Sequence, residues 1–126
     1  MPSIDDDGWC LISAVDRHKA APKSFEIPSE AERSQLQPGS GAQLLFDIET
    51  RENGAVIDRG VDRMWVIVRY VLDAGYVGVL DSDPGKAENL RLRPGDSIEF
   101  AAEHVCKIDS PPRAFVLEKY GSDFFD

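Results

Sequence analysis

Two histidines and two cysteines are the side chains of this sequence best suited to catalysis. His104 and Cys106 lie two positions apart at the start of an expected strand, so their side chains would point the same way. A thiol beside an imidazole can act as a nucleophile with its general base. Neither neighbourhood has the features that activate a thiol, so ordinary core or edge residues are the preferred interpretation. We predict no catalytic residue. A ligand-binding or enzymatic pocket near this pair is the alternative.

The same residue types are too scattered to predict a metal site. A zinc site needs three or four ligands held close together. The sequence has no H-x-H, H-x-x-x-H or C-x-x-C pattern, and Cys10 is far from Cys106 in the chain. Asp81, Asp83 and Glu88 could gather a cation, but their series is too short and irregular for an EF-hand loop, and a solvated turn is preferred. Since phosphate-binding and nucleophile-elbow motifs are also missing, we predict neither a metal nor a cofactor.

The charge balance restricts the partner more than it restricts the chemistry. Asp and Glu number 23 against 14 Lys and Arg, which gives a formal net charge of −9. Nucleic acids and anionic membranes are bound through Lys and Arg, so both are poor partners for this chain. A basic protein or a cation is a better electrostatic match. Acidity that serves only solubility explains the same numbers. We predict a basic protein partner, and the oligomeric state stays open.

Aromatic and acidic residues around an expected hairpin form the candidate binding surface. Trp65 and Tyr70 lie on its first strand, Tyr76 lies on its second strand, and Asp81 and Asp83 follow at its end. Trp and Tyr are frequent anchors of protein interfaces. They are equally good core residues, and the core is the first interpretation for each of the three. These five residues are the predicted binding residues.

Length and terminal sequence indicate one intracellular domain. A chain of 126 residues fits a single domain. Its acidic start lacks the apolar segment of a signal peptide, and no apolar stretch is long enough to span a membrane. We therefore expect a cytoplasmic protein with two reduced thiols. Residues 1–8 are expected to be a flexible acidic N-terminus, residues 9–110 the β-rich core, and residues 111–126 a C-terminal helix or tail.

Hydrophobic alternation predicts a mainly β protein. The expected strands are residues 9–15, 43–49, 64–71, 76–80, 97–100 and 105–108, with a weaker strand at residues 55–58. Asn53-Gly54 predicts a tight turn, and a loop is expected around Gly60. Gly78, inside a strand, indicates a bulge or a close approach of backbones.

Few helices are expected. Ser29 and Glu32 have capping-box spacing, which predicts a short helix that ends near Gln35. Residues 16–28 are expected to form an irregular connection with at most one helical turn. A C-terminal helix laid on the sheet would explain why the hairpin at residues 64–80 is apolar on both faces.

The predicted fold class is a β-rich α+β domain. We expect five or six strands in a strongly bent antiparallel sheet or small partial barrel, with one or two short helices. An SH3-like barrel is compatible with short strands joined by Pro-Gly turns.

Several turn and strand segments carry a resemblance. They are residues 23–28, 36–39, 44–46, 63–66, 76–84 and 92–100, and the most distinctive are Arg63-Met64-Trp65 and Asp81-Ser82-Asp83-Pro84. The chain resembles a group of small uncharacterised bacterial domains across residues 22–108. Some members resemble immunity proteins of polymorphic toxin systems. The resemblance implies a toxin-neutralising immunity protein and supplies no catalytic residue. Our hypothesis is therefore a non-enzymatic protein-binding module.

Overall fold

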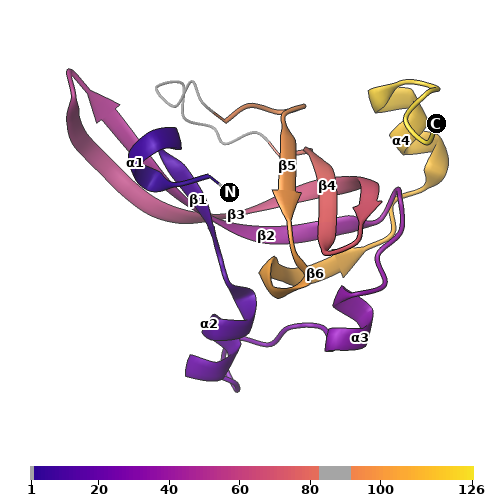
Figure 1. Ribbon diagram of the computed structural model, residues 1–126, viewed down its shortest axis with the longest axis horizontal. Helices are drawn as coiled ribbons and strands as arrows, with labels where there is room; N and C mark the ends of the chain where they lie inside the picture. Colours follow the sequence, from indigo (N-terminus) through magenta and orange to yellow (C-terminus); the bar gives the residue numbers. More distant parts are fainter. Residues whose placement is uncertain (1, 83–91) are drawn as a thin grey trace.

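The computed structural model describes residues 2–82 and 92–126, whose main feature is a curled antiparallel sheet (Figure 1). In chain order, its elements are α1 (Ile4–Asp7), β1 (Trp9–Ile12), α2 (Ala14–Ala20), α3 (Glu30–Arg33), β2 (Gly41–Glu52), β3 (Ala55–Leu72), β4 (Gly75–Leu80), β5 (Ser97–Phe100), the 3-10 helix η1 (Ala102–His104), β6 (Val105–Asp109) and α4 (Arg113–Tyr120). The strand order is β1-β2-β3-β4-β5, and β6 pairs with β2 beside β1. The predicted β-rich α+β class with a bent, half-closed sheet is confirmed.

β2 and β3 form one long hairpin that carries the rest of the fold. Asn53 and Gly54 close it with positive φ angles of 52° and 81°, as the predicted tight turn requires. The expected loop around Gly60 is wrong, because Gly60 pairs with Ile48 inside a continuous strand β3. β2 extends far enough to pair with β3 on both sides of Gly60, and the register shifts between Thr50 and Arg51, where Ile57 has no partner in β2.

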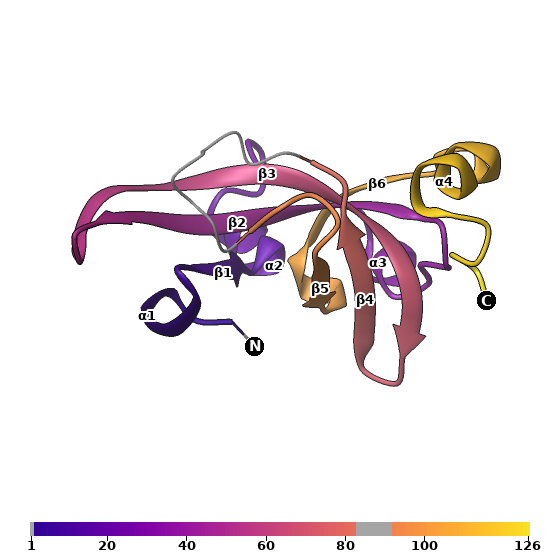
Figure 2. The ribbon, with the colours of Figure 1, turned by 90° about the horizontal axis from the view of Figure 1, so that it is seen from above.

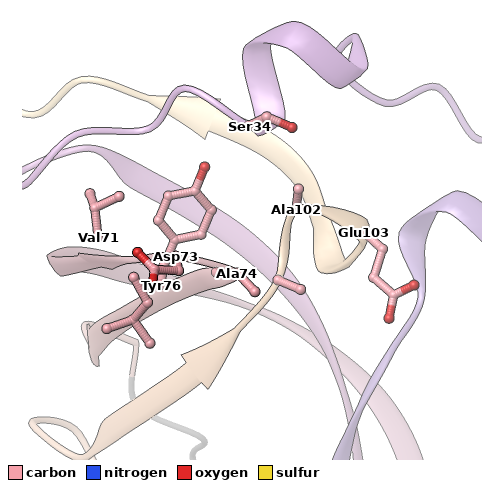
Figure 3. Close-up of a pocket in the computed structure, with 10 residues that line it drawn as sticks. Ser34, Val71, Asp73, Ala74, Tyr76, Ala102 and Glu103 are labelled. Carbon is pink, nitrogen blue, oxygen red and sulfur yellow. The ribbon is translucent and has the colours of Figure 1, made fainter.

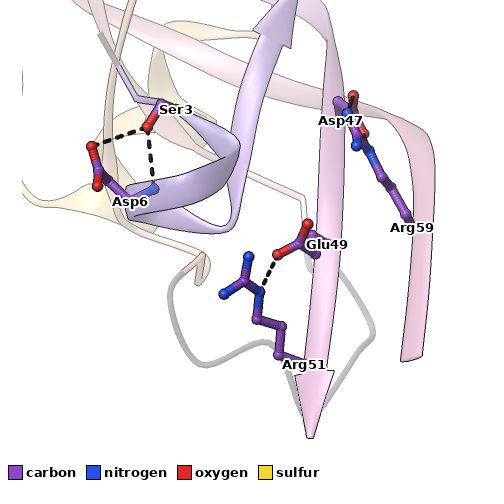
Figure 4. Close-up of polar contacts among 6 residues, drawn as sticks. All are labelled: Ser3, Asp6, Asp47, Glu49, Arg51 and Arg59. Carbon is purple, nitrogen blue, oxygen red and sulfur yellow. Dashed lines mark hydrogen bonds and ion pairs between the residues drawn. The ribbon is translucent and has the colours of Figure 1, made fainter. Parts of the chain in front are cut away.

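The end of this hairpin, the arm (residues 49–60), extends beyond the sheet body (Figures 1 and 2). β1 reaches only to Ile48, so it does not pair with the arm. Ion pairs run along the hairpin: the guanidinium of Arg59 contacts both carboxylate oxygens of Asp47, at 3.2 and 3.0 Å, and Arg51 pairs with Glu49 (Figure 4). In both pairs the arginine is about half exposed, whereas the carboxylate partner is largely buried.

The sheet bends where backbones come closest. A Cβ on Gly78 would lie 3.0 Å from the carbonyl oxygen of Ile67 and 3.3 Å from Val66, which confirms the predicted close approach. The register of β3 against β4 shifts between Val68 and Tyr70, opposite this glycine. The bend allows β5 to pair with β4 and to cover the concave face seen from above in Figure 2.

The concave face holds the main hydrophobic core, which we call the inner face. Its centre is a set of side chains with almost no exposed surface: Leu44, Phe46, Val66, Val68, Leu80, Ile98, Phe100 and Val105. Trp9 closes one end, with its ring 5.6 Å from that of Phe46, and Tyr76 closes the other, 5.2 Å from Phe100. Burial of this apolar surface is the dominant stabilising term.

The opposite, outer face carries two separate smaller clusters. In the first, Val116 of α4 and Phe124 pack on Ile67 and Val79, so the prediction of a C-terminal helix on the hairpin is confirmed. The second cluster joins Leu45, Ala14 and Cys106 with partly buried Ile12, Phe25 and Ile27. The two clusters lie on either side of the stretch of β3 that carries Trp65.

Polar segments form more helix than expected, since the described residues contain α1 to α4 and η1 where one or two helices were predicted. The first strand ends at Ile12, because Ser13 caps α2 by accepting a hydrogen bond from the backbone of Asp16 at 3.1 Å. Ser3 caps α1 in the same way. The predicted capping box of Ser29 is confirmed, although α3 ends at Arg33. Within the described residues, no helix has the length and apolar character needed to cross a membrane.

Candidate binding face around Trp65

Trp65 lies on the outer face between the two outer clusters. Its neighbours Met64 and Val66 point into the inner core, so alternation along β3 places Trp65 on the opposite side. Ile67, two residues on, is covered by α4, and the guanidinium of Arg63 lies 5.1 Å from the ring of Phe25. Trp65 itself is only partly buried and belongs to neither cluster. The elements that cover this face stop on either side of it.

The backbone of Trp65 is held by the residues that follow β4. Its N–H donates to the hydroxyl of Ser82 at 2.9 Å, and its carbonyl accepts from the backbone N–H of Asp81 at 2.9 Å. On the other side, Gln43 pairs with Trp65 and with Lys107 of β6. Since directly paired residues share a face, the three side chains form one row across the outer face.

A hollow opens next to this row where the sheet carries a glycine. In the neighbouring row, Gly41 pairs with Ile67 on one side and with Asp109 on the other, so that row has no side chain in its middle position. The hollow has a volume of about 350 Å³, and we call it the Gly41 hollow. Its lining residues are Gly41, Trp65, Ile67, Asp81, Asp109, Pro111, Pro112 and Phe115. It therefore combines two aromatic rings and two prolines with two carboxylates.

A second hollow lies on the other side of Trp65, and we call it the Cys106 hollow. It has a volume of about 540 Å³ and is lined by Glu26, Ile27, Pro28, Trp65, Cys106, Lys107, Ile108 and Asp109. Trp65 and Asp109 line both hollows, so the two form one continuous surface with the indole between them. This candidate binding face carries the carboxylates of Glu26, Asp81 and Asp109 and one ammonium group, that of Lys107.

The three carboxylates differ in what they already bind. Oδ1 of Asp81 accepts from Nζ of Lys119 at 2.7 Å and from the hydroxyl of Tyr120. Burial, followed by this hydrogen bond to Asp81, raises the pKa of Tyr120 well above its ordinary value, so the phenol stays a donor. Within residues 2–82 and 92–126, the exposed carboxylates of Glu26 and Asp109 make no hydrogen bond or ion pair.

The structure brings together two of the five predicted binding residues. Trp65 and Asp81 line the same hollow. Tyr70 is 47% exposed but is not a lining residue of either hollow. Tyr76 is buried, with its hydroxyl donating to the carbonyl of Arg33 at 2.7 Å and accepting from the backbone N–H of Leu36 at 3.3 Å. Asp83 lies outside the described residues.

Residues that the sequence did not single out complete the face. Asp109 and Phe115 flank the Pro111-Pro112 pair, and Glu26 comes from the connection before α3. The only sequence signals were the two prolines directly after a strand and the glycine that begins β2. Neither signal indicates which residues of distant segments will meet.

A further hollow of about 390 Å³ lies near the β3–β4 turn (Figure 3). Asp73, Ala74 and Glu103 are among its lining residues. In Figure 3 the hydroxyl of Tyr76 points toward the segment that carries Ser34, whereas the carboxylate of Glu103 points away from it. The polar group of Tyr76 is thus already used by the backbone, and this hollow gathers no other predicted binding residue.

His104 and Cys106 do not form an activated pair. His104 ends η1, and its Nδ1 accepts from the backbone N–H of Ala101 at 2.9 Å. Burial lowers the pKa of His104, so the ring is neutral near pH 7. Cys106 donates its thiol to the carbonyl of Gln43 at 3.0 Å, and burial raises its pKa. A neutral imidazole and a neutral thiol with separate backbone partners lack the arrangement of a nucleophile and its base.

Metal-binding side chains are likewise dispersed. The described part of the chain contains no group of three or more His, Cys, Asp or Glu residues placed to hold a metal ion. Cys10 and Cys106 are both free thiols, and burial is the main cause that raises the pKa of Cys10. Raised thiol pKa values disfavour the thiolate, which is the form that binds metals.

Comparisons of the chain with protein-family models, with curated proteins and with solved structures give no match.

Proposed function

We propose that the chain is a non-enzymatic protein-binding module that holds a basic protein on the face around Trp65. The observation that carries this proposal is the position of Trp65, partly buried between two hollows that share Asp109. A large aromatic side chain fixed by its backbone and left partly open on both sides is the kind of residue that anchors an interface.

The charges of the face support a basic partner. Three of the four charged side chains that line the two hollows are carboxylates, and the chain as a whole carries a net charge of −9. Complementary charge steers a basic partner toward the face and suppresses acidic competitors. Because exposed charges are screened by salt, binding should weaken as ionic strength rises.

The resemblance to immunity proteins suggests the class of partner. We propose a basic toxin domain whose surface the module covers, so that neutralisation follows from binding alone. Co-expression provides the matching test: the chain should protect cells from the toxin, and a Trp65→Ala variant should not. Equal protection by both chains would contradict this proposal.

A pocket for catalysis or a small ligand near His104 and Cys106 has less support. Cys106 lines its hollow together with Trp65, but His104 is not among the lining residues. Each of the two side chains is hydrogen-bonded to a backbone group, the imidazole as an acceptor and the thiol as a donor, and this arrangement does not favour proton transfer between them.

Two glycines of the same hairpin provide a matched test. A Cβ on Gly41 would lie 3.5 Å from the Cβ of Asp109 and 3.6 Å from Pro111, which is ordinary contact, so a leucine there would extend into the Gly41 hollow. A Cβ on Gly60 would have no atom within 4 Å, so a leucine there would stand in open space on the arm. Neither glycine has a positive φ angle.

The experiment is affinity capture of the tagged chain and of both leucine variants from its own cells, read by quantitative mass spectrometry. We expect one stoichiometric basic protein on the native chain and on Gly60→Leu. We expect at least about tenfold less of it on Gly41→Leu, a loss typical of one interface anchor. Thermal unfolding of the variants checks that both remain folded. A partner that all three chains retain equally would refute a binding face around Trp65.

A further inference from the structure

We propose that the Gly41 hollow receives the side chain of an arginine. This deepens the proposed function, because it names the group through which a basic partner would bind. Binding of an arginine side chain in the hollow can be tested without any protein partner.

The size of the hollow suits one side chain. Its volume of about 350 Å³ is near the lower end of ligand pockets, which range from about 300 to 1,000 Å³. Gly41 creates this space, because any larger residue would place atoms between Asp109 and Pro111. The hollow therefore has room for a single extended side chain and too little for a large cofactor.

The walls suit a flat cation on an apolar stem. Trp65 and Phe115 supply aromatic rings, and Pro111 and Pro112 supply saturated carbon surface. A guanidinium group stacks on aromatic faces and is weakly hydrated, whereas the ammonium of lysine is compact and strongly hydrated. The methylene groups of arginine can pack along the prolines while the head reaches a polar group.

The carboxylates provide the acceptors. Asp109 lies at the hollow because β6 pairs with Gly41 of β2. Asp81 comes directly after β4, and its backbone N–H donates to the carbonyl of Trp65. Both known donors to Asp81 use its Oδ1, so Oδ2 accepts no hydrogen bond from the described residues. The carboxylate of Asp109 likewise makes no hydrogen bond or ion pair with the described residues. A guanidinium group has five donors in a fixed fork, which can serve two carboxylates from one position.

The residues that line the hollow are not basic, although Lys119 borders it. Its lining residues include two acids and no Lys, Arg or His. Lys119 is not a lining residue, but its Nζ bonds to Oδ1 of Asp81 at 2.7 Å and lies 5.7 Å from the ring centre of Phe115, so an incoming arginine would share these two residues with it. An anion would find two carboxylates there, so the hollow selects a cation.

The test uses three capped tripeptides that differ only in the central residue: Gly-Arg-Gly, Gly-Lys-Gly and Gly-citrulline-Gly. Citrulline has nearly the shape of arginine without its charge. Binding is followed through the two indole N–H signals of the ¹⁵N-labelled chain, with Trp65→Phe assigning the signal of Trp65. Trp9 is buried in the inner core, only 8% exposed, and serves as an internal control.

We expect a saturable shift of the Trp65 signal with the arginine peptide and none of the Trp9 signal. Affinity should fall in the order arginine, lysine, citrulline. The loss from arginine to citrulline should be about tenfold or more, since charge-assisted hydrogen bonds are removed. Gly41→Leu should abolish the shift and Asp109→Asn should weaken binding several-fold, while Gly60→Leu should bind like the native chain.

Each outcome separates this inference from the proposed function. An arginine peptide that leaves the Trp65 signal unmoved, or moves it no more than citrulline does, overturns the arginine site even if a basic protein is captured. A saturable shift selective for arginine upholds the site even if capture finds no protein partner, and only the proposed function would then fail.

Discussion

The two faces of the β2–β3 pair differ in how completely they are covered. On the inner face, Phe46, Val66 and their neighbours form one continuous core with almost no exposed surface. On the outer face, α4 covers one end and the connection around Phe25 covers the other, which leaves Trp65 between them. An apolar residue on a strand therefore becomes core or surface according to the elements that other parts of the chain place over it.

The two tryptophans show the same difference between the inner and the outer face. Trp9 and Trp65 both lie in apolar strand segments. Trp9 packs against Phe46 and is 8% exposed, whereas Trp65 is bordered by two hollows. Their local sequences do not distinguish them, because the segments that cover or expose each indole are distant in the chain.

The largest expected effect is on the inner face. Phe46→Ala should lower the free energy of unfolding by about 3–5 kcal/mol, since a fully buried aromatic ring leaves a cavity. Trp65→Ala should cost less than half as much in the same denaturant titration, because its indole is only partly buried, and it should abolish partner binding. If the two substitutions cost the same, Trp65 would be a core residue and the contrast between the faces would be lost.

The next effect separates the two tyrosines of the hairpin. Tyr76→Phe should lower the free energy of unfolding by about 1–3 kcal/mol, because the buried carbonyl of Arg33 and the N–H of Leu36 lose their partner. Tyr70→Phe is the control, since Tyr70 is 47% exposed and its change should lie within about 0.5 kcal/mol. Equal effects of the two substitutions in denaturant titrations would contradict the assignment of Tyr76 to the core.

The smallest effect concerns pH. Burial holds the pKa of His104 below its ordinary value of 6.5, so below that pH the unfolded chain binds a proton that the folded chain does not. His104 therefore contributes stability that is fully present above pH 6.5 and is lost as the pH falls toward its lowered folded pKa. The native chain should lose more unfolding free energy between pH 7 and pH 5 than a His104→Gln variant does. Parallel pH curves for the two chains would show that His104 does not titrate differently in the folded state.

Much of the fold was predictable because its signals are local. Alternation located the strands, Asn53-Gly54 located the hairpin turn, and Ser29 with Glu32 located a helix start. The continuity of β3 through Gly60 was not predictable, since it depends on how far β2 extends to meet it. The strand expected at residues 9–15 was too long, because the cap at Ser13 was not anticipated.

The candidate site was predictable only where residues that are neighbours in the sheet belong to the same hairpin and so lie close together in the sequence. Trp65 and Asp81 were both predicted, and they meet because β3 and β4 are joined by a short turn. Tyr70 and Tyr76 differ in burial because the register of β3 against β4 shifts between Val68 and Tyr70; Gly78 indicated a bulge or a close approach here, but it did not indicate which tyrosine would be buried. Asp109 reaches the face only through the pairing of β6 with β2, which joins segments more than sixty positions apart.

Photo-crosslinking in the protein's own cells can show whether the outer face around Trp65 binds a basic protein, as we propose. The photo-reactive amino acid p-benzoylphenylalanine would replace Phe115, which borders the Gly41 hollow and is 43% exposed. The control position is Ile57, which is 53% exposed on the arm. We expect one basic protein to be crosslinked from position 115 and not from position 57. Crosslinks of equal yield from both positions, or from position 57 alone, would contradict the account.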